Sequence, residues 1–513
     1  MKPSVTALAL ASAFAAATPL PAAALDLLQA WQEAAAIDPL VAASQSQAAA
    51  TSERIPQVKA TLGPTLNASG SANAQVLDTT ATRAVDYTSG NIALLGTMPL
   101  YRPANVEALR QSELAAQIGE VQVQQARQDL ILRVAQAYFD VLIAEDSLAA
   151  IRVSKQLIGE QFASAKRNFE VGTATITDQQ EAQSRLDLTR AQEVAAENDL
   201  DVRRALLAQL IGRPLDPLNT LRRGVEVRPP EASREGEWAN IARQQNNLVR
   251  QAELTTEIAK REIERARYGG FPTLDLVGQV AGGRNTTSNV GIRSASGLAG
   301  LQFNWPVYTG GAVPARVREA IALQDKSQFE TEQARRNAEQ AARQTFLGVK
   351  SGIEQVRALE AAERSTQLSL ESNQLGYQVG VRISIDVLNA VQLLSLTQRD
   401  LSRARYDVLL NGLRLKATAG DLTETDVRTI NSLLEPPRPP EAIPALTTPG
   451  AAGRLGTGSG ATPSSAPGGS TPGAAPGAGG AGAAGTSGQR PGAAPTVRGG
   501  RSQVPVAPAP APR

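Results

Sequence analysis

The sequence predicts an α+β protein in which long coiled-coil α-helices carry a four-strand contribution to a trimeric, 12-stranded transmembrane β-barrel. Three observations predict this fold. Long stretches without proline repeat apolar residues at coiled-coil spacing, shorter stretches alternate apolar and polar residues, and the whole pattern occurs twice along the chain. The expected architecture is an internal duplication of one large unit of helices and strands.

Residues 1–24 have the pattern of a secretory signal peptide. Lys2 precedes an apolar run at 5–17, and Ala22-Ala23-Ala24 matches the small residues found at a cleavage site. The apolar run is too short to span a bilayer, and no apolar run of about 18 residues follows it. We therefore expect an exported chain that is periplasmic, secreted or an outer-membrane barrel.

The composition excludes several kinds of site. The chain has no His, no Cys and only two Met among 513 residues. Zinc fingers, Ser-His-Asp or Cys-His catalytic sets, thiol redox centres and iron–sulfur clusters are thereby ruled out, as is a lipid anchor on cysteine. We expect no metal, no cofactor and no enzyme activity, although catalysis by carboxylates or lysine is compatible with the composition. The net charge of +2 does not favour nucleic-acid binding.

The C-terminal segment 436–513 differs from the rest of the chain. It holds 16 of the 31 Pro and has six Arg against one Glu. Such a composition cannot bury enough apolar surface to offset the conformational entropy of the chain. We expect a disordered Pro/Gly/Ala-rich tail that lies outside the folded body.

The body of the chain repeats itself. The segment 169–178 recurs at 377–386, at an offset of 208 residues. This offset is far longer than the roughly 20–50 residues of common solenoid repeats, so two copies of one large unit explain it better. We expect a first structural repeat at 25–223 and a second at 224–435, each with a helix, two barrel strands and long helices in the same order.

A very long helix is predicted between residues 104 and 171, where the chain has no Pro and little Gly. At ~1.5 Å per residue, this helix would be on the order of 100 Å long. Its apolar residues alternate spacings of four and three, and the same seam follows the second Val-Gly turn. On this feature alone, an ordinary coiled coil is the preferred interpretation. The seam residues are Leu130, Val134, Ala137, Val141, Ala144, Leu148 and Ile151, then Ala390, Leu394, Thr397, Leu401, Ala404, Val408, Asn411 and Leu415.

Four stretches have the period of two that is typical of strands, at 62–76, 92–100, 273–280 and 301–307. Strands of about 10–14 residues with one apolar and one polar face fit the wall of a membrane barrel. A half-buried soluble sandwich predicts the same alternation. It does not predict polar residues on the second face of every strand in a chain of long helices. Short polar connections are expected near 77–89 and 283–295.

The few aromatic residues gather where strands meet helices. Tyr101, Phe271, Trp305 and Tyr308 all fall at such junctions. We expect them to form a girdle of interface aromatics at one membrane–water boundary. Trp31 and Trp238 lie in helical stretches, where packing is the simpler explanation.

Closure of the sheet requires other copies of the chain. Four strands cannot form a barrel, and an open sheet edge in lipid leaves N–H and C=O groups that cost several kcal/mol each. Three copies would give twelve strands around an aqueous lumen, which is a homotrimer surrounded by outer-membrane lipid. The long helices would then extend the tube into the periplasm.

This arrangement resembles the TolC family of outer-membrane efflux and type I secretion channels. The likeness covers 25–435 and includes the duplication. It is carried by the segments 137–142, 169–178, 271–274, 306–311, 376–386 and 404–406.

The resemblance implies a homotrimer with a helical tunnel that is closed at its periplasmic end by a polar latch. The matching positions are Thr177, Asp178, Tyr377 and Arg382. An Arg can form paired charge-assisted hydrogen bonds with a carboxylate, and a Tyr hydroxyl can donate to the same group. Helix N-capping is the alternative for Asp178 and for its repeat equivalent Asp386, and we expect it for at least one of them.

The resemblance also implies a carboxylate ring at the narrowest point of the tunnel. Asp386 matches one ring position, and Asn389 stands at the second position where the family usually has Asp. A trimer would then carry one ring of three charges, with weaker cation preference and weaker block by trivalent cations.

The expected function is an outer-membrane export duct, a channel-tunnel for efflux or type I protein secretion. The resemblance implies that a periplasmic adaptor (membrane fusion protein) and an inner-membrane transporter of ABC or RND type open its periplasmic end. The alternative is a periplasmic coiled-coil structural or adaptor protein, which explains the heptads but not the amphipathic strands. A carboxylate-based hydrolase lacks a convergent set of acids. The sequence does not specify the cargo.

Overall fold

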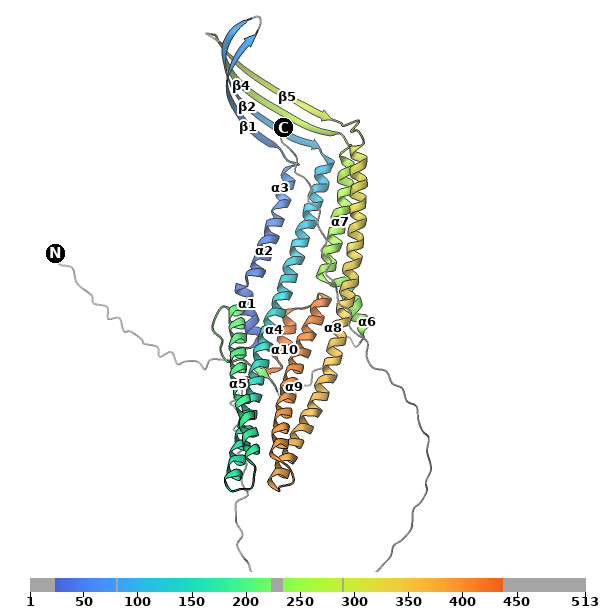
Figure 1. Ribbon diagram of the computed structural model, residues 1–513. Coiled ribbons are helices and arrows are strands. Elements are labelled where there is room, and N and C mark those ends of the chain that lie inside the picture. Colours follow the sequence, from blue (N-terminus) through green and yellow to red (C-terminus); the bar gives the residue numbers. More distant parts are fainter. Residues whose placement is uncertain (1–23, 80–81, 223–233, 288–289, 437–513) are drawn as a thin grey trace, which may run out of the picture. The chain divides into compact units, whose positions relative to one another are not determined.

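The computed structural model describes residues 24–79, 82–222, 234–287 and 290–436 (Figure 1). The expected signal peptide and the expected tail, apart from their boundary residues, lie outside these ranges. The described body is α+β, as predicted, with long helices joined to one sheet. Within these ranges, no helix combines the length and the apolar character needed to cross a membrane.

The sheet has four antiparallel strands in the order β1-β2-β4-β5. They form where the sequence alternates, and they are longer than predicted, with 15 to 20 residues each. The prediction of connecting loops near 77–89 and 283–295 is wrong, because strand pairing continues through most of both segments. Polar Thr, Ser and Asn residues can extend a ladder without an apolar face. The strands are β1 (Thr65–Thr79), β2 (Thr82–Tyr101), β4 (Thr273–Thr287) and β5 (Val290–Asn304).

The register gathers apolar side chains on one side of the sheet. Leu94 of β2 lies opposite Ala68 of β1 and opposite Val280 of β4, and directly opposed residues share a face. We call this side the apolar face. The other side carries mostly Asn, Ser, Thr and Gln. The large residues of the apolar face are exposed, namely Leu66, Ile92, Leu94, Met98, Leu276, Val280, Leu301 and Phe303.

Two long helical hairpins extend from the sheet (Figure 1). The predicted long helix forms as α4, which is paired with α5, and α8 is paired with α9 in the same way. Both α5 and α9 have 36 residues, and they start 208 residues apart. The bounds are α4 (Pro103–Glu170), α5 (Ile176–Ile211), α8 (Ala312–Gln378) and α9 (Ser384–Ala419).

Shorter helices flank the upper parts of α4 and α8. They are separated by breaks at Asp38 and Asn246, which are 208 residues apart and which both cap the helix that follows. Asp38 also lies 3.0 Å from the Arg133 guanidinium of α4, which fastens this joint to the long helix. The short helices are α1 (Leu27–Ile37), α2 (Pro39–Ser52), α3 (Arg54–Ala60), α6 (Glu235–Gln245) and α7 (Asn247–Tyr268), with α10 (Glu424–Asn431) and the strand pair β3 (Thr220–Leu221) and β6 (Leu434–Glu435) near the end of the body.

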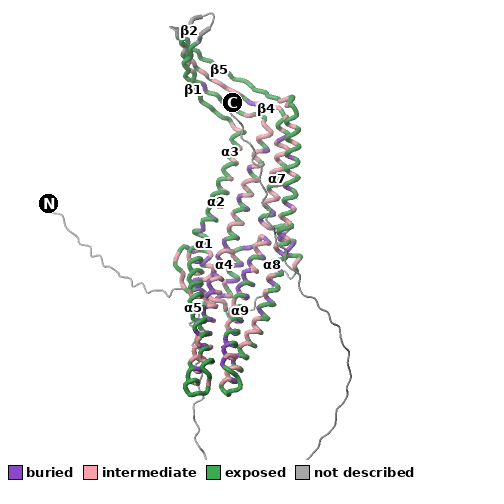
Figure 2. Tube along the Cα trace, in the orientation of Figure 1, coloured by how far each residue is buried: buried purple, intermediate pink, exposed green. Residues whose placement is uncertain are grey.

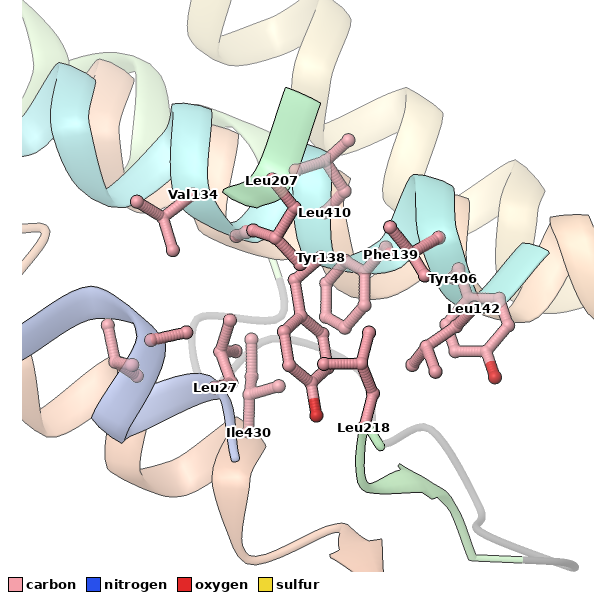
Figure 3. Packing of buried hydrophobic residues seen from close by; sticks show 14 of the residues in the cluster. Leu27, Val134, Tyr138, Phe139, Leu142, Leu207, Leu218, Tyr406, Leu410 and Ile430 are labelled. Atoms are coloured by element: carbon pink, nitrogen blue, oxygen red, sulfur yellow. The ribbon is translucent and has the colours of Figure 1, made fainter. Parts of the chain in front are cut away.

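The largest core cluster lies at mid-height of the helices, around Tyr138 and Phe139 of α4 (Figure 3). The Tyr138 hydroxyl lies within hydrogen-bond distance of the backbone oxygens of Leu25 (3.0 Å) and Asn219 (2.9 Å). The Phe139 ring stacks on Tyr406 of α9 with a centroid distance of 5.6 Å. The predicted heptad seams are buried except at Ala137 and Asn411, which are half-buried. Figure 2 shows that exposed residues dominate the sheet and the hairpin tips.

Candidate gate at the helical hairpin tips

Both hairpins turn over a Val-Gly pair. Gly172 has φ 77° and Gly380 has φ 78°, which is the left-handed region that favours glycine. The Gly172 amide donates to the Phe169 carbonyl (3.0 Å), and the Gly380 amide donates to the Tyr377 carbonyl (3.1 Å). The two turns are therefore equivalent structures that reverse the chain within a few residues.

Asp178 caps helix α5. Its Oδ2 accepts from the Thr175 amide (3.1 Å) and from the Thr175 hydroxyl (2.8 Å), while the Thr175 hydroxyl accepts from the Asp178 amide. This is a reciprocal capping box. Within the described part of the chain, Asp178 forms no hydrogen bond with Tyr377 or Arg382. Capping is thus the role that the structure gives Asp178, and Thr177 beside it is exposed.

Asp386 is placed differently although it is the repeat equivalent of Asp178. The residue before α9 is Ile383, which has no side-chain oxygen, so no side chain caps this helix. The Asp386 carboxylate instead lies 3.5 Å from Arg382 on the same hairpin and stays about one-third exposed. Asn389 is exposed one turn further along α9. Asp386 and Asn389 are therefore available to solvent at the tip.

Tyr377 connects the two hairpins. Its hydroxyl accepts from Asn168 Nδ2 at 3.2 Å. About two turns back along α4, Gln161 Nε2 donates to the Ser384 hydroxyl at 2.9 Å. The sequence analysis missed Asn168, Gln161 and Ser384. The signal that could have found them is the heptad spacing of the polar residues Gln161 and Asn168 on one side of α4.

Apolar and charged contacts extend this connection away from the tips. A buried cluster brings Ile158 and Ala165 of α4 against Val387 of α9. Further up, the hydroxyls of Ser402 and Tyr406 on α9 both donate to the Asp146 carboxylate of α4. Burial raises the pKa of Asp146, and these hydroxyls lower it by less. The two hairpins are therefore joined by polar and apolar contacts between α4 and the second hairpin, from the tips up to Asp146.

The aromatic residues lie at the other end of the helices. Tyr101 is the last residue of β2, Phe271 lies between α7 and β4, and Trp305 and Tyr308 lie between β5 and α8. All four are exposed. They share one end of the sheet, which is the placement that the sequence predicted, and their membrane role stays a prediction.

An ion pair between a partly exposed arginine and a buried carboxylate at the same end was missed by the sequence analysis. Arg102 donates to both carboxylate oxygens of Asp275 at 2.8 and 2.6 Å, and Asp275 is only 6% exposed. This bidentate pair joins the start of α4 to β4. A single acidic residue in a strand was the only signal in the sequence.

Comparison with known proteins identifies the class. The family model described as outer membrane efflux protein matches the chain twice, at 30–213 and 238–421. These segments are 208 residues apart and contain both long hairpins and all four strands of the sheet. The fold and the double match define an outer-membrane export channel built from long helices and a sheet. The chain belongs to the outer membrane efflux protein family, which confirms the predicted resemblance.

Curated relatives agree with this assignment. The outer membrane protein TolC of Escherichia coli is 31% identical over 431 residues, covering 80% of this chain and 85% of the relative. The alkaline protease secretion protein AprF of Pseudomonas aeruginosa is 29% identical over 350 residues, covering 67% and 72%. The solved outer membrane channel CmeC of Campylobacter jejuni has the same fold, with a TM-score of 0.67 at 16% identity over 79% of this chain and 89% of that one.

The function follows from these findings. The protein is an outer-membrane duct for efflux or type I secretion, as predicted, and its family is one of transport channels. The alternative of a periplasmic coiled-coil spacer or adaptor is set aside by the family match over both halves of the chain.

Proposed function

We propose that three copies of this chain close a 12-stranded barrel and one continuous helical tunnel in the periplasm. The observation that carries this proposal is the open sheet: β1 and β5 are its two edges, and each exposes a row of backbone donors and acceptors. Lipid does not tolerate such edges. The β5 edge of one copy would pair with the β1 edge of the next, the apolar face would meet lipid, and the polar face would line the lumen.

The chain then divides by role. We take residues 1–24 as a signal peptide, 25–223 and 224–435 as two structural repeats, and 436–513 as a tail. Tyr101, Phe271, Trp305 and Tyr308 would lie at the periplasmic boundary of the membrane, where exposed aromatic rings are favourable.

The same assembly would close at the hairpin tips. Asp178 and Arg382 each have a partner within their own hairpin in the single chain, and we propose that the latch between them forms where neighbouring copies meet. Asp386 would form one ring of three carboxylates around the opening. Exposed links of this kind contribute only about 1 kcal/mol each, which suits a latch that a partner opens. The double variant Asp178→Ala/Arg382→Ala should therefore raise single-channel conductance, and an unchanged conductance would argue against the latch.

A periplasmic adaptor and an inner-membrane transporter of ABC or RND type would supply the opening and the energy. The name of the relative AprF describes protease secretion, and this favours protein cargo as one class of substrate. Opening would be a population shift of the hairpins driven by adaptor binding.

Engineered cysteines test the trimer, because the chain has no cysteine of its own. Asn67→Cys on β1 is combined with single cysteines at successive β5 positions from Gly291 to Asn304. Disulfide-linked dimers and trimers should form only at the β5 position opposite Asn67 and, more weakly, at positions two residues away from it. Cysteine placed at Asn240, on the exposed side of α6, is the control that should not crosslink. A detergent-extracted monomer that conducts no ions in a planar bilayer would refute the proposal.

A further inference from the structure

Two arginines interrupt the apolar face. Arg284 of β4 and Arg293 of β5 are direct partners in the strand register, and Arg284 also lies opposite Gly90 of β2. Arg284 is four residues from Val280, so its side chain is on the same side of the sheet. Like charges directly opposite one another destabilise a sheet. This arginine pair therefore calls for an anion between or beside the two guanidinium groups.

The described part of the chain supplies no such anion. Both arginines are exposed, and neither forms an ion pair or a side-chain hydrogen bond with any residue that the structure describes. Asp86 shares their side of the sheet, but it lies four residues beyond Gly90 along β2, or ~13 Å. That separation is too long for an ion pair. Among the described residues, then, no carboxylate lies within reach of either arginine, and an anion from outside the chain would satisfy both of them.

A surface hollow of about 1060 Å³ connects the arginine pair to apolar side chains. Arg284 and Arg293 line one part of it, and Ile92, Leu94 and Val280 line another. Small and polar residues of the neighbouring strands complete the lining, among them Ser71, Asn91 and Ser294. The hollow thus offers two cations next to a shallow aliphatic surface. A ligand with a phosphate joined to a hydrocarbon chain matches both parts.

The depth of the arginine pair in the proposed barrel agrees with a lipid headgroup. The stretch of β4 from Leu274, near the interface aromatics, to Arg284 extends ~34 Å along the strand. With a strand tilt of about 40°, this is ~25 Å across the membrane, which is the height of a barrel's apolar band. The arginines therefore lie at the outer boundary of the band, where the cost of a charged residue on the lipid side is small.

We infer that Arg284 and Arg293 bind the phosphate of an outer-leaflet lipid, whose acyl chain lies along Ile92, Leu94 and Val280. Guanidinium groups bind phosphate oxygens through paired charge-assisted hydrogen bonds, and two of them can share one headgroup. This inference rests on the proposed barrel, because it requires the apolar face to meet lipid.

Lipid binding by the purified channel tests the inference. Trimer in mild detergent is titrated with diphosphorylated lipid A, and bound lipid is counted by native mass spectrometry. The variant Arg284→Gln/Arg293→Gln should bind lipid A more weakly, with an affinity lowered at least roughly tenfold. Arg250→Gln/Arg364→Gln is the matched control, since it removes the same charge from exposed helix positions and should bind like the parent.

A second variant and a second probe test the acyl-chain part. Val280→Ser/Ile92→Ser should weaken lipid A binding about tenfold while leaving the arginines in place. Inorganic phosphate at the same concentration should not displace lipid A, and displacement would overturn the lipid assignment in favour of a simple anion site. Unchanged lipid binding in Arg284→Gln/Arg293→Gln would overturn the inference. Trimer mass and bilayer conductance, measured on the same samples, report on the proposed channel independently.

Discussion

Asn168 at the end of α4 donates a 3.2 Å hydrogen bond to the hydroxyl of Tyr377 at the end of α8. This contact ties the first hairpin to the second at their tips, beside both Val-Gly turns. Its two partners are 209 residues apart in the sequence. A movement that separates the hairpins has to break it.

Tyr377→Phe should favour the open channel. The substitution removes the acceptor of the Asn168 bond, which contributes about 1 kcal/mol, so the closed-to-open ratio should fall roughly fivefold. Open probability in planar bilayers measures this. Gln183→Ala, which removes a bond within α5 alone, is the control that should leave the ratio unchanged. Equal effects of the two substitutions would mean that the Asn168–Tyr377 contact does not hold the gate.

Asp178→Ala and Asp386→Ala should differ although the positions are equivalent. Asp178 completes the capping box of α5, so its loss should destabilise the first turn of that helix by about 1 kcal/mol. Asp386 accepts no capping bond from the residue before α9. Amide hydrogen exchange over residues 176–179 and 384–387 compares the two turns. A similar acceleration of amide exchange in both helix turns would be evidence against different capping roles for the two aspartates.

The charge at the tip should set ion selectivity. Asp386→Asn should lower cation preference at low salt, because it removes the exposed carboxylate, and Asn389→Asp should raise both cation preference and block by trivalent cations. Reversal potentials across a salt gradient measure the preference. Strong cation selectivity that persists in Asp386→Asn would show that other groups form the ring.

Asp146 should make stability depend on pH. Burial raises its pKa in the folded state, so the folded protein holds the proton more tightly than the unfolded chain. The stabilisation of the folded state by the protonated Asp146 carboxyl is fully present at acidic pH. It is lost as pH rises through the raised pKa of the folded state. Asp146→Asn removes it, and the variant should gain thermal stability relative to the parent between about pH 4 and 7. A difference in Tm that is constant over this range would contradict the prediction.

Arg102→Gln should weaken the junction between α4 and the sheet. The substitution leaves the nearly buried Asp275 carboxylate without its cation, which costs about 2 kcal/mol. The double variant Arg102→Gln/Asp275→Asn should recover most of this loss, since no buried charge remains unpaired. Thermal unfolding measures both. Arg428→Gln, at an exposed pair with Glu424, serves as the control with an expected effect below about 1 kcal/mol.

Periodicity explains how much of the fold could be predicted. The seam from Leu130 to Ile151 repeats over several turns, and the structure buries it almost completely. The alternation of apolar and polar residues predicted where the strands lie, but not where they end. Polar residues near Thr79 and Thr82 continue the strand pairing, and they carry no apolar alternation that would indicate it.

The tip shows what periodicity cannot supply. A repeat offset makes Asp178 and Asp386 look alike, yet the exchange of Thr175 for Ile383 gives them different partners. The Asn168–Tyr377 bond depends on how closely two helices approach, and a single sequence does not encode that distance in any local pattern.

The breaks at Asp38 and Asn246 have a mechanical consequence. Each ends a short helix beside α4 or α8, whereas α4 and α8 run unbroken from the sheet to the tips. The joint at Asp38 is fastened to Arg133 by an ion pair. Only the flanking helices can bend at this level, so the continuous α4 and α8 act as rigid levers that carry a movement of the tips up to the sheet.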